Sequence, residues 1–261
     1  MLSTEFNGTL GRIQMFDRNL ALLALLLATS FGQTDQLVAQ PTLSRYFPAQ
    51  VGMNWTYERL EPTLSGSTEE RYVECVAVGS CDGERTATMR QVYFIGTVKT
   101  VTSIVYAYST SGRKLYENES HNDLIGSRRN VDRPVVIWIP ASDDSVTWSR
   151  NDMGKDGRVD CVIEYSARIV PICSTALRTY RNALMVIERT YCNAGTQSAR
   201  YAVQLGLIPE RFSKKESGRA LLSSRRSYFA PDVGLVKCLT FGGDGVLCGS
   251  TASQLTNFSG R

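Results

Sequence analysis

The segment Tyr46-Phe-Pro-Ala-Gln-Val-Gly-Met-Asn-Trp-Thr-Tyr57 contains the first structural element that the sequence predicts. Trp55 and Tyr57 stand two residues apart, with Thr56 between them. Successive side chains of a strand point to opposite faces, so both aromatic rings would share one face and Thr56 would lie on the other. This alternation is typical of a strand that is buried on one side.

Further runs rich in Val, Ile, Thr and Tyr recur at short spacing, and these residue types suit a pleated surface. The runs cover residues 71–78, 86–98, 100–108, 114–117, 134–139, 145–149, 158–169, 184–192, 220–229, 235–241 and 246–248. Turn signals such as Asp82-Gly83 and Ser111-Gly112 separate many of them. Only the region 198–205 favours a helix. We therefore expect a mainly β protein with one antiparallel sheet domain over residues 46–261 and few short helices.

The composition is that of a globular chain with a real core. Of 261 residues, 43% are hydrophobic and 21% are charged. The formal net charge of +4 is too small, at this length, to indicate a nucleic-acid partner.

The N-terminus predicts export. Arg18 precedes the apolar run Leu20-Ala-Leu-Leu-Ala-Leu-Leu-Leu-Ala28, and small residues follow at Thr29-Ser30-Phe31-Gly32. This order is that of a secretory signal peptide over residues 1–32, and the run is about half the roughly 20 residues that a spanning helix needs. A start at Met15 would give a more compact leader, so both starts stay open. After cleavage we expect a polar lead-in over 33–45, no transmembrane span, and a periplasmic or extracellular location.

Seven cysteines follow the leader, and exported chains meet oxidising conditions, so disulfides are expected. Cys75 with Cys81 and Cys238 with Cys248 are favoured, because each pair flanks a glycine-containing turn. Cys173 with Cys192, or Cys161 with Cys173, is a third choice. An odd count leaves at least one thiol outside any intramolecular bridge.

Two groups of residues could carry chemistry, and each has an ordinary structural explanation. His121, the only histidine, could act as a base oriented by Asp123, although an exposed loop explains it equally and no G-x-S-x-G nucleophile motif occurs. Asp152, Asp156 and Asp160 could bind calcium, but an Asp-Gly hairpin turn explains the same residues. We therefore expect no catalytic residue, no metal and no cofactor.

Two surface and core patterns bear on binding. The basic cluster Arg211, Lys214, Lys215, Arg219, Arg225 and Arg226 is interrupted by acidic residues and is interpreted as a solvated face. The aromatic residues could line a cavity for an apolar ligand, with Trp55, Tyr57, Trp138 and Trp148 as candidates, although an ordinary β core is the simpler interpretation.

Three segments together resemble a group of uncharacterised exported bacterial β proteins, including TapB-like ones. They are the opening segment quoted above, Thr179-Tyr-Arg-Asn-Ala-Leu-Met-Val186, and Tyr228-Phe-Ala-Pro-Asp-Val-Gly-Leu-Val-Lys237. Asp232 stands where the closing pattern has glycine, so a local difference in that turn is expected. By analogy, the resemblance implies the curved or half-barrel sheet of LolA-type lipoprotein carriers, but it carries over no catalytic residue.

These observations leave three hypotheses for the function. The first is a non-enzymatic exported protein that binds a lipid or another apolar molecule. The second is a structural or surface-interaction module of the cell envelope, and the third, least favoured, is a hydrolase.

Overall fold

The structure is a computed structural model that describes residues 42–60, 70–95, 98–122, 127–130, 134–141, 144–154, 157–213, 218–247 and 252–260. These residues belong to one compact unit, Pro41–Arg261. The predicted signal peptide over 1–32 lies outside the described residues and stays a prediction. Within the described ranges, no helix has the length and apolar character needed to cross a membrane.

Thirteen strands of the described ranges form one antiparallel sheet in the order β6-β5-β4-β3-β2-β1-β13-β12-β11-β10-β9-β8, and β7 also pairs with β5. Their bounds are β1 (Asn54–Arg59), β2 (Glu70–Cys81), β3 (Glu84–Ile95), β4 (Val98–Tyr108), β5 (Lys114–Asn122), β6 (Ser127–Asn130), β7 (Val135–Trp138), β8 (Val146–Met153), β9 (Val159–Ser174), β10 (Thr179–Asn193), β11 (Arg219–Ala230), β12 (Gly234–Gly242) and β13 (Ser253–Ser259). The described helices are α2 (Leu43–Tyr46), α3 (Gln197–Gln204) and the 3-10 helix η1 (Glu210–Ser213). The predicted fold class, a single curved antiparallel sheet with few short helices, is confirmed, and α3 is the helix expected near 198–205.

Strands that follow one another in sequence mostly pair with one another, and the first and last strands join the two halves of the sheet. Asn54 of β1 pairs with Ser259 of β13. Short hairpins connect neighbouring strands, as at Asp82 and Gly83. Their φ angles of 51° and 77° are the positive values that a tight hairpin turn requires.

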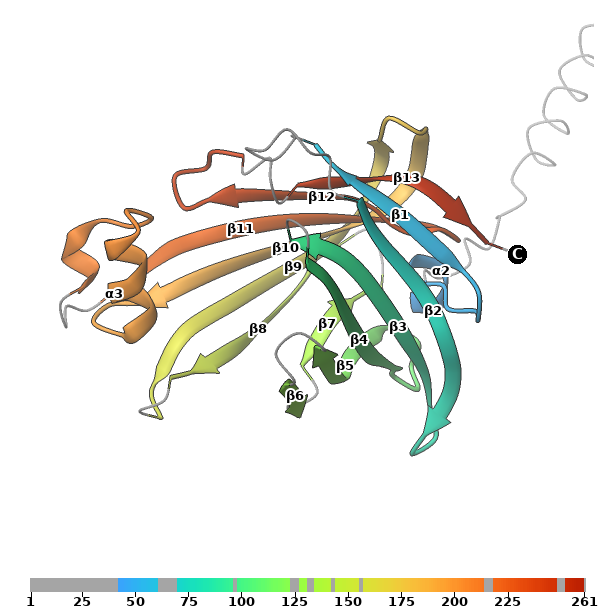
Figure 1. Ribbon diagram of the computed structural model, residues 1–261, viewed down its shortest axis with the longest axis horizontal. Coiled ribbons are helices and arrows are strands. Elements are labelled where there is room, and N and C mark those ends of the chain that lie inside the picture. The colour runs from blue at the N-terminus through green and yellow to red at the C-terminus, as the bar shows by residue number, and fades with distance from the viewer. Residues whose placement is uncertain are drawn as a thin grey trace, which may run out of the picture. The chain divides into compact units, whose positions relative to one another are not determined.

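The sheet curves until its two ends approach each other, as Figure 1 shows for β7 and β8. A side-chain contact spans this approach: the indole nitrogen of Trp148 on β8 donates to the carbonyl of Val135 on β7 at 2.9 Å. Trp148 also stacks on Tyr165, with ring centroids 5.1 Å apart. Side chains therefore join β7 and β8, and we call this contact the seam.

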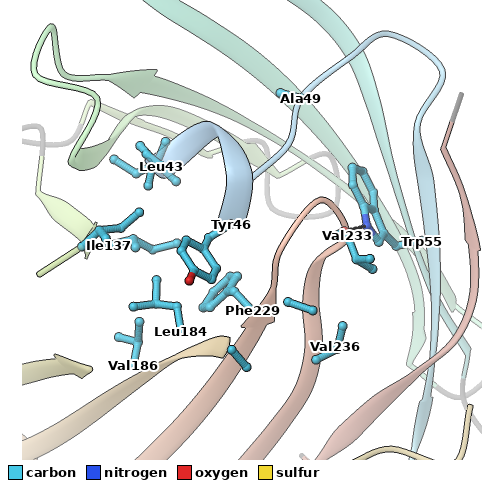
Figure 2. Packing of buried hydrophobic residues seen from close by; sticks show 14 of the residues in the cluster. Leu43, Tyr46, Ala49, Trp55, Ile137, Leu184, Val186, Phe229, Val233 and Val236 are labelled. Atoms are coloured by element: carbon cyan, nitrogen blue, oxygen red, sulfur yellow. Dashed lines mark hydrogen bonds between the residues drawn. The ribbon is translucent and has the colours of Figure 1, made fainter. Parts of the chain in front are cut away.

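The helix α2 packs against the concave side of the sheet and contacts segments of both halves. The amide of Leu43 donates to Gly112 after β4 at 2.8 Å, and the hydroxyl of Tyr46 donates to Asn182 on β10 at 2.9 Å. Figure 2 shows Tyr46 pointing from α2 toward Leu184 and Phe229. The predicted polar lead-in over 33–45 overlaps α2 at its end, where Leu43 is fully buried in the core.

The three segments that carry the sequence resemblance meet beside α2. The indole nitrogen of Trp55 donates to the carbonyl of Val233 in the turn between β11 and β12. The backbone amide of Asp232 in the same turn donates to the carbonyl of Arg45 at 2.6 Å. Asn182, from the middle segment, accepts the Tyr46 hydroxyl. The residues 45–57 thus fasten the strands of the C-terminal half.

The predicted pairing of Cys75 with Cys81 is wrong, because both residues lie on β2. Six steps at roughly 3.3 Å per residue separate them by about 20 Å, whereas a disulfide needs Cα atoms within about 7 Å. The turn that was expected between them comes after Cys81, at Asp82-Gly83.

The third predicted pairing is wrong in both versions. Cys161 and Cys173 lie far apart along the same strand, β9, and the register places Tyr180, not Cys192, opposite Cys173. Cys192 instead lies directly opposite Cys161, with the two sulfur atoms 3.7 Å apart as free thiols. Cys248 lies outside the described residues, so its pairing with Cys238 stays a prediction.

Candidate functional site

The concave side of the sheet holds a cavity of about 710 Å³ that is partly open to solvent. Strands of both halves line it, with Tyr57 on β1, Tyr106 on β4 and Phe229 on β11 among the contributors. Close-packed protein interiors leave few voids larger than a water molecule, and small-molecule sites measure roughly 300–1,000 Å³. The size of this cavity is therefore that of a ligand site rather than of a packing defect.

The chain that follows α2 forms one apolar wall of the cavity. Phe47 contacts the ring of Tyr106 edge-on, with centroids 5.1 Å apart. The Phe47 carbonyl accepts the hydroxyl of Tyr108 at 2.9 Å, which holds this segment against β4. Trp55 and Phe229 extend the same apolar surface.

Polar side chains interrupt the apolar lining. Arg71, Gln91, Tyr106, Glu117 and Arg225 all line the cavity, and we call them the polar lining. A terminal nitrogen of Arg71 donates to the Gln91 side-chain carbonyl at 2.5 Å, and the Arg71 guanidinium lies over the Tyr57 ring, 5.8 Å from its centroid. Arg225 forms an ion pair with Glu188 on β10 at 3.0 Å. The cavity is thus suited to a molecule with both apolar and polar parts.

The tyrosines at the cavity stay neutral far above physiological pH. Burial, with a smaller contribution from Glu117, raises the pKa of Tyr106 to about 12, against the opposing effect of Arg71 and Arg225. Burial also raises the pKa of Tyr57, although Arg71 acts in the other direction. These phenols therefore act as hydrogen-bonding groups and aromatic surfaces, not as charged ones.

Two of the four predicted ligand-binding aromatics line the cavity and two do not. Trp55 and Tyr57 lie at its wall. Trp138 and Trp148 lie together at the seam, with ring centroids 6.3 Å apart, and the Lys114 ammonium sits 4.1 Å from the centroid of Trp138. The paired indoles fasten the two ends of the sheet.

The sequence did not reveal the arginines of the cavity. Arg225 was interpreted as part of a solvated basic cluster, yet it lines the cavity, whereas its neighbour Arg226 lies over Phe241 on the other face. The signal that could have separated the two is the alternation of Arg225 with Ser227 and Phe229, which share its face.

The structure does not test the three predicted metal ligands as a set. Asp156 lies outside the described residues, and the Asp160 carboxylate accepts hydrogen bonds from the amide and the hydroxyl of Ser198, at 3.2 and 2.5 Å. Partial burial alone would raise the pKa of Asp160, but the hydrogen bonds from Ser198 and Thr196 outweigh it and hold that pKa below its usual range. The described ranges contain no group of three or more His, Cys, Asp or Glu side chains that could hold a metal ion.

The predicted pair of His121 and Asp123 is not tested. His121 lies on β5 opposite Ser103, and Asp123 lies outside the described residues.

No family model and no curated protein matches this chain. Two solved structures share a distant likeness to it. A protein of Bacteroides fragilis, assigned as exported and with a YmcC-like fold, is 9% identical, covers 83% of this chain and 99% of its own, and has a TM-score of 0.36. A protein of Parabacteroides distasonis, assigned as a lipoprotein, is 13% identical, covers 82% and 98%, and has a TM-score of 0.37. At such scores no property of this protein is inferred from them, and the resemblance to TapB-like and LolA-type proteins stays a prediction.

Proposed function

We propose that this protein is an exported, non-enzymatic binder of an amphipathic small molecule, which it holds in the cavity of its curved sheet. The observation that carries the proposal is the cavity of about 710 Å³, which stays open although α2 fills the neighbouring part of the concave side. Burial of an acyl chain there would release water from the aromatic wall. Each buried CH₂ group would contribute roughly 0.8 kcal/mol of favourable binding free energy.

Titration of the purified protein with N-phenyl-1-naphthylamine, a neutral apolar dye that fluoresces when it leaves water, tests the proposal. We expect saturable binding by the wild type. Replacing Ser227, which lines the cavity, by Phe fills part of the volume and should weaken binding at least about tenfold.

Ser224 provides the matched control. It lies on the same strand three residues earlier, so its side chain points to the opposite face of the sheet. Ser224→Phe should therefore bind the dye as the wild type does. The absence of saturable binding by a folded wild-type protein would contradict the proposed function.

Export is tested separately, by mass spectrometry of the protein produced in a bacterial host. We expect the mature chain in the periplasm or medium to begin after Ser30 or Gly32. An intact N-terminus on a protein that stays in the cytoplasm would contradict this part of the proposal.

A further inference from the structure

We infer that the ligand carries a carboxylate head group on a long apolar chain, and that Arg71 binds this head group. The inference rests on the proposed binding function and names the chemical class of the ligand.

Arg71 has hydrogen-bonding capacity that the protein itself does not use. Its Nε atom is shielded from solvent and has no hydrogen-bond partner. Its one hydrogen bond within the described residues goes to the neutral amide of Gln91, and no carboxylate there lies within ion-pair distance of it. Buried polar atoms almost always have hydrogen-bond partners, so the unpaired Nε of this half-buried side chain calls for an acceptor. A carboxylate that accepts from Nε and a terminal nitrogen would supply that acceptor and a counter-charge, in the side-by-side geometry that arginine favours.

The other charges of the cavity favour an anion as well. The described lining contains three arginines, Arg59, Arg71 and Arg225, and one acidic residue, Glu117. Arg71, Arg225 and Glu117 all act on the pKa of Tyr106, so the three charges lie within electrostatic reach of this ring. Of the two arginines near Tyr106, Arg225 already has Glu188 as its partner, and Arg71 is therefore the better placed to bind an added carboxylate.

The apolar wall explains why the anion should belong to an amphiphile rather than to a small soluble ion. Phe47, Trp55 and Phe229 line the same cavity as Arg71. A carboxylate at Arg71 would leave its hydrocarbon chain against these rings.

Displacement of N-phenyl-1-naphthylamine by dodecanoate, dodecanol and dodecylamine tests the inference, because the three competitors share one chain and differ in the charge of the head group. We expect wild-type protein to bind dodecanoate at least about tenfold more tightly than dodecanol. Hydrogen bonds to a charged group are roughly twice as strong as neutral ones, and a carboxylate can accept two of them from Arg71. Dodecylamine should bind most weakly.

Three substitutions locate the effect. Arg71→Gln should bring dodecanoate down to the affinity of dodecanol and leave dodecanol unchanged. Arg226→Gln removes the same charge from the opposite face and should keep the wild-type preference. Arg71→Lys, which keeps the charge without the paired donors, should retain a smaller preference and serves if the Gln variant fails to fold.

The outcomes separate the two proposals. Equal affinity of the wild type for dodecanoate and dodecanol, or a preference for dodecylamine, would overturn the role of Arg71 and leave the binding function standing. Failure of the dye and of all three competitors to bind would instead overturn the binding function itself.

Discussion

Asp232 occupies a position in the turn between β11 and β12 where the backbone is left-handed, with a φ angle of 62°. Glycine adopts this conformation freely, and Asp is among the few other residues that tolerate it. The turn would therefore also accept the glycine that the resembling pattern has at this position. The local difference expected from Asp232 lies in its side chain and not in the backbone of the turn. Its contact with Arg45, 3.8 Å long and exposed, contributes little to stability.

Asp232→Gly is accordingly expected to leave the free energy of unfolding within about 0.5 kcal/mol of the wild type. Asp232→Val should lower it by about 1–2 kcal/mol, because a β-branched residue is strained at this φ angle. Urea unfolding of the three proteins checks this. Equal stability of the Val and Gly variants would show that the turn adopts another conformation.

Cys161 and Cys192 are the pair of thiols that the register brings together, with sulfur atoms 3.7 Å apart. A hydrogen bond between the two thiols lowers the pKa of Cys161 below its usual value, although burial opposes this. Because the thiolate is the reactive form, we expect Cys161 to react more readily than an ordinary buried thiol.

We predict that mild oxidation with diamide joins Cys161 to Cys192. Each thiol loses its proton and one electron, and the diamide takes up both protons and both electrons. The product should lose 2 Da by mass spectrometry, and peptide mapping should find the bridge between these residues. The reaction should accelerate as the pH rises, at a lower pH than for an ordinary thiol, and Cys192→Ser should abolish this bridge. A bridge mapped to Cys173 instead would contradict the register of β9 and β10.

At the scale of elements, α3 depends on residues outside the helix. The Thr196 side chain caps it by accepting from the amide of Ala199, and Asp160 of β9 accepts from the amide and hydroxyl of Ser198. Ala199 and Ala202 then pack with Cys192 in a small second core. The helix is thus fastened to the sheet at its first turn.

Asp160→Ala should destabilise the protein by about 1 kcal/mol at pH 7, through the loss of hydrogen bonds to a charged group. The pKa of Asp160 is lowered in the folded state, so its contribution is present above the ordinary value of 3.8 and is lost as the pH falls through the lower folded-state value. The stabilities of variant and wild type should therefore converge in acid. A difference that stays constant from pH 7 to pH 2 would mean that the carboxylate charge has no part in it.

At the scale of the whole molecule, the curved sheet is held by backbone ladders everywhere except at the seam, among the strands that the structure describes. There, Trp148 donates the hydrogen bond to Val135 and contacts the ring of Trp138. Its stack on Tyr165 of the neighbouring strand β9 holds the indole in place. Side-chain contacts of this kind are weaker than a continuous ladder, so the sheet should open first between β7 and β8.

Trp148→Ala should raise amide hydrogen exchange in β7 and β8 at least about tenfold, while the amides that join β1 to β13 change less. Trp148→Phe keeps an aromatic stack without the indole donor and should give an intermediate result. Uniform acceleration over all strands would show that the substitution lowers global stability without opening the seam. Dye binding by Trp148→Ala would show whether the cavity depends on the closed seam.

The sequence determined features that depend on neighbouring residues alone. Trp55 and Tyr57 share the buried face, as their spacing predicted, the turn forms at Asp82-Gly83, and the helix forms near 198–205. Alternation along a strand, the positive φ of a turn residue and the period of a helix are all set within a few positions of the chain.

Tertiary structure decided the rest, because it depends on how strands distant in sequence align and on how strongly the sheet bends. The register of β9 and β10 selects Cys161 and Cys192 as partners, and the curvature turns Arg71 and Arg225 toward one cavity while Trp138 and Trp148 meet at the seam. Leu43 became part of the core because α2 enters the concave side. A one-residue change in register would exchange the two faces of a strand, so no local pattern could have placed these side chains.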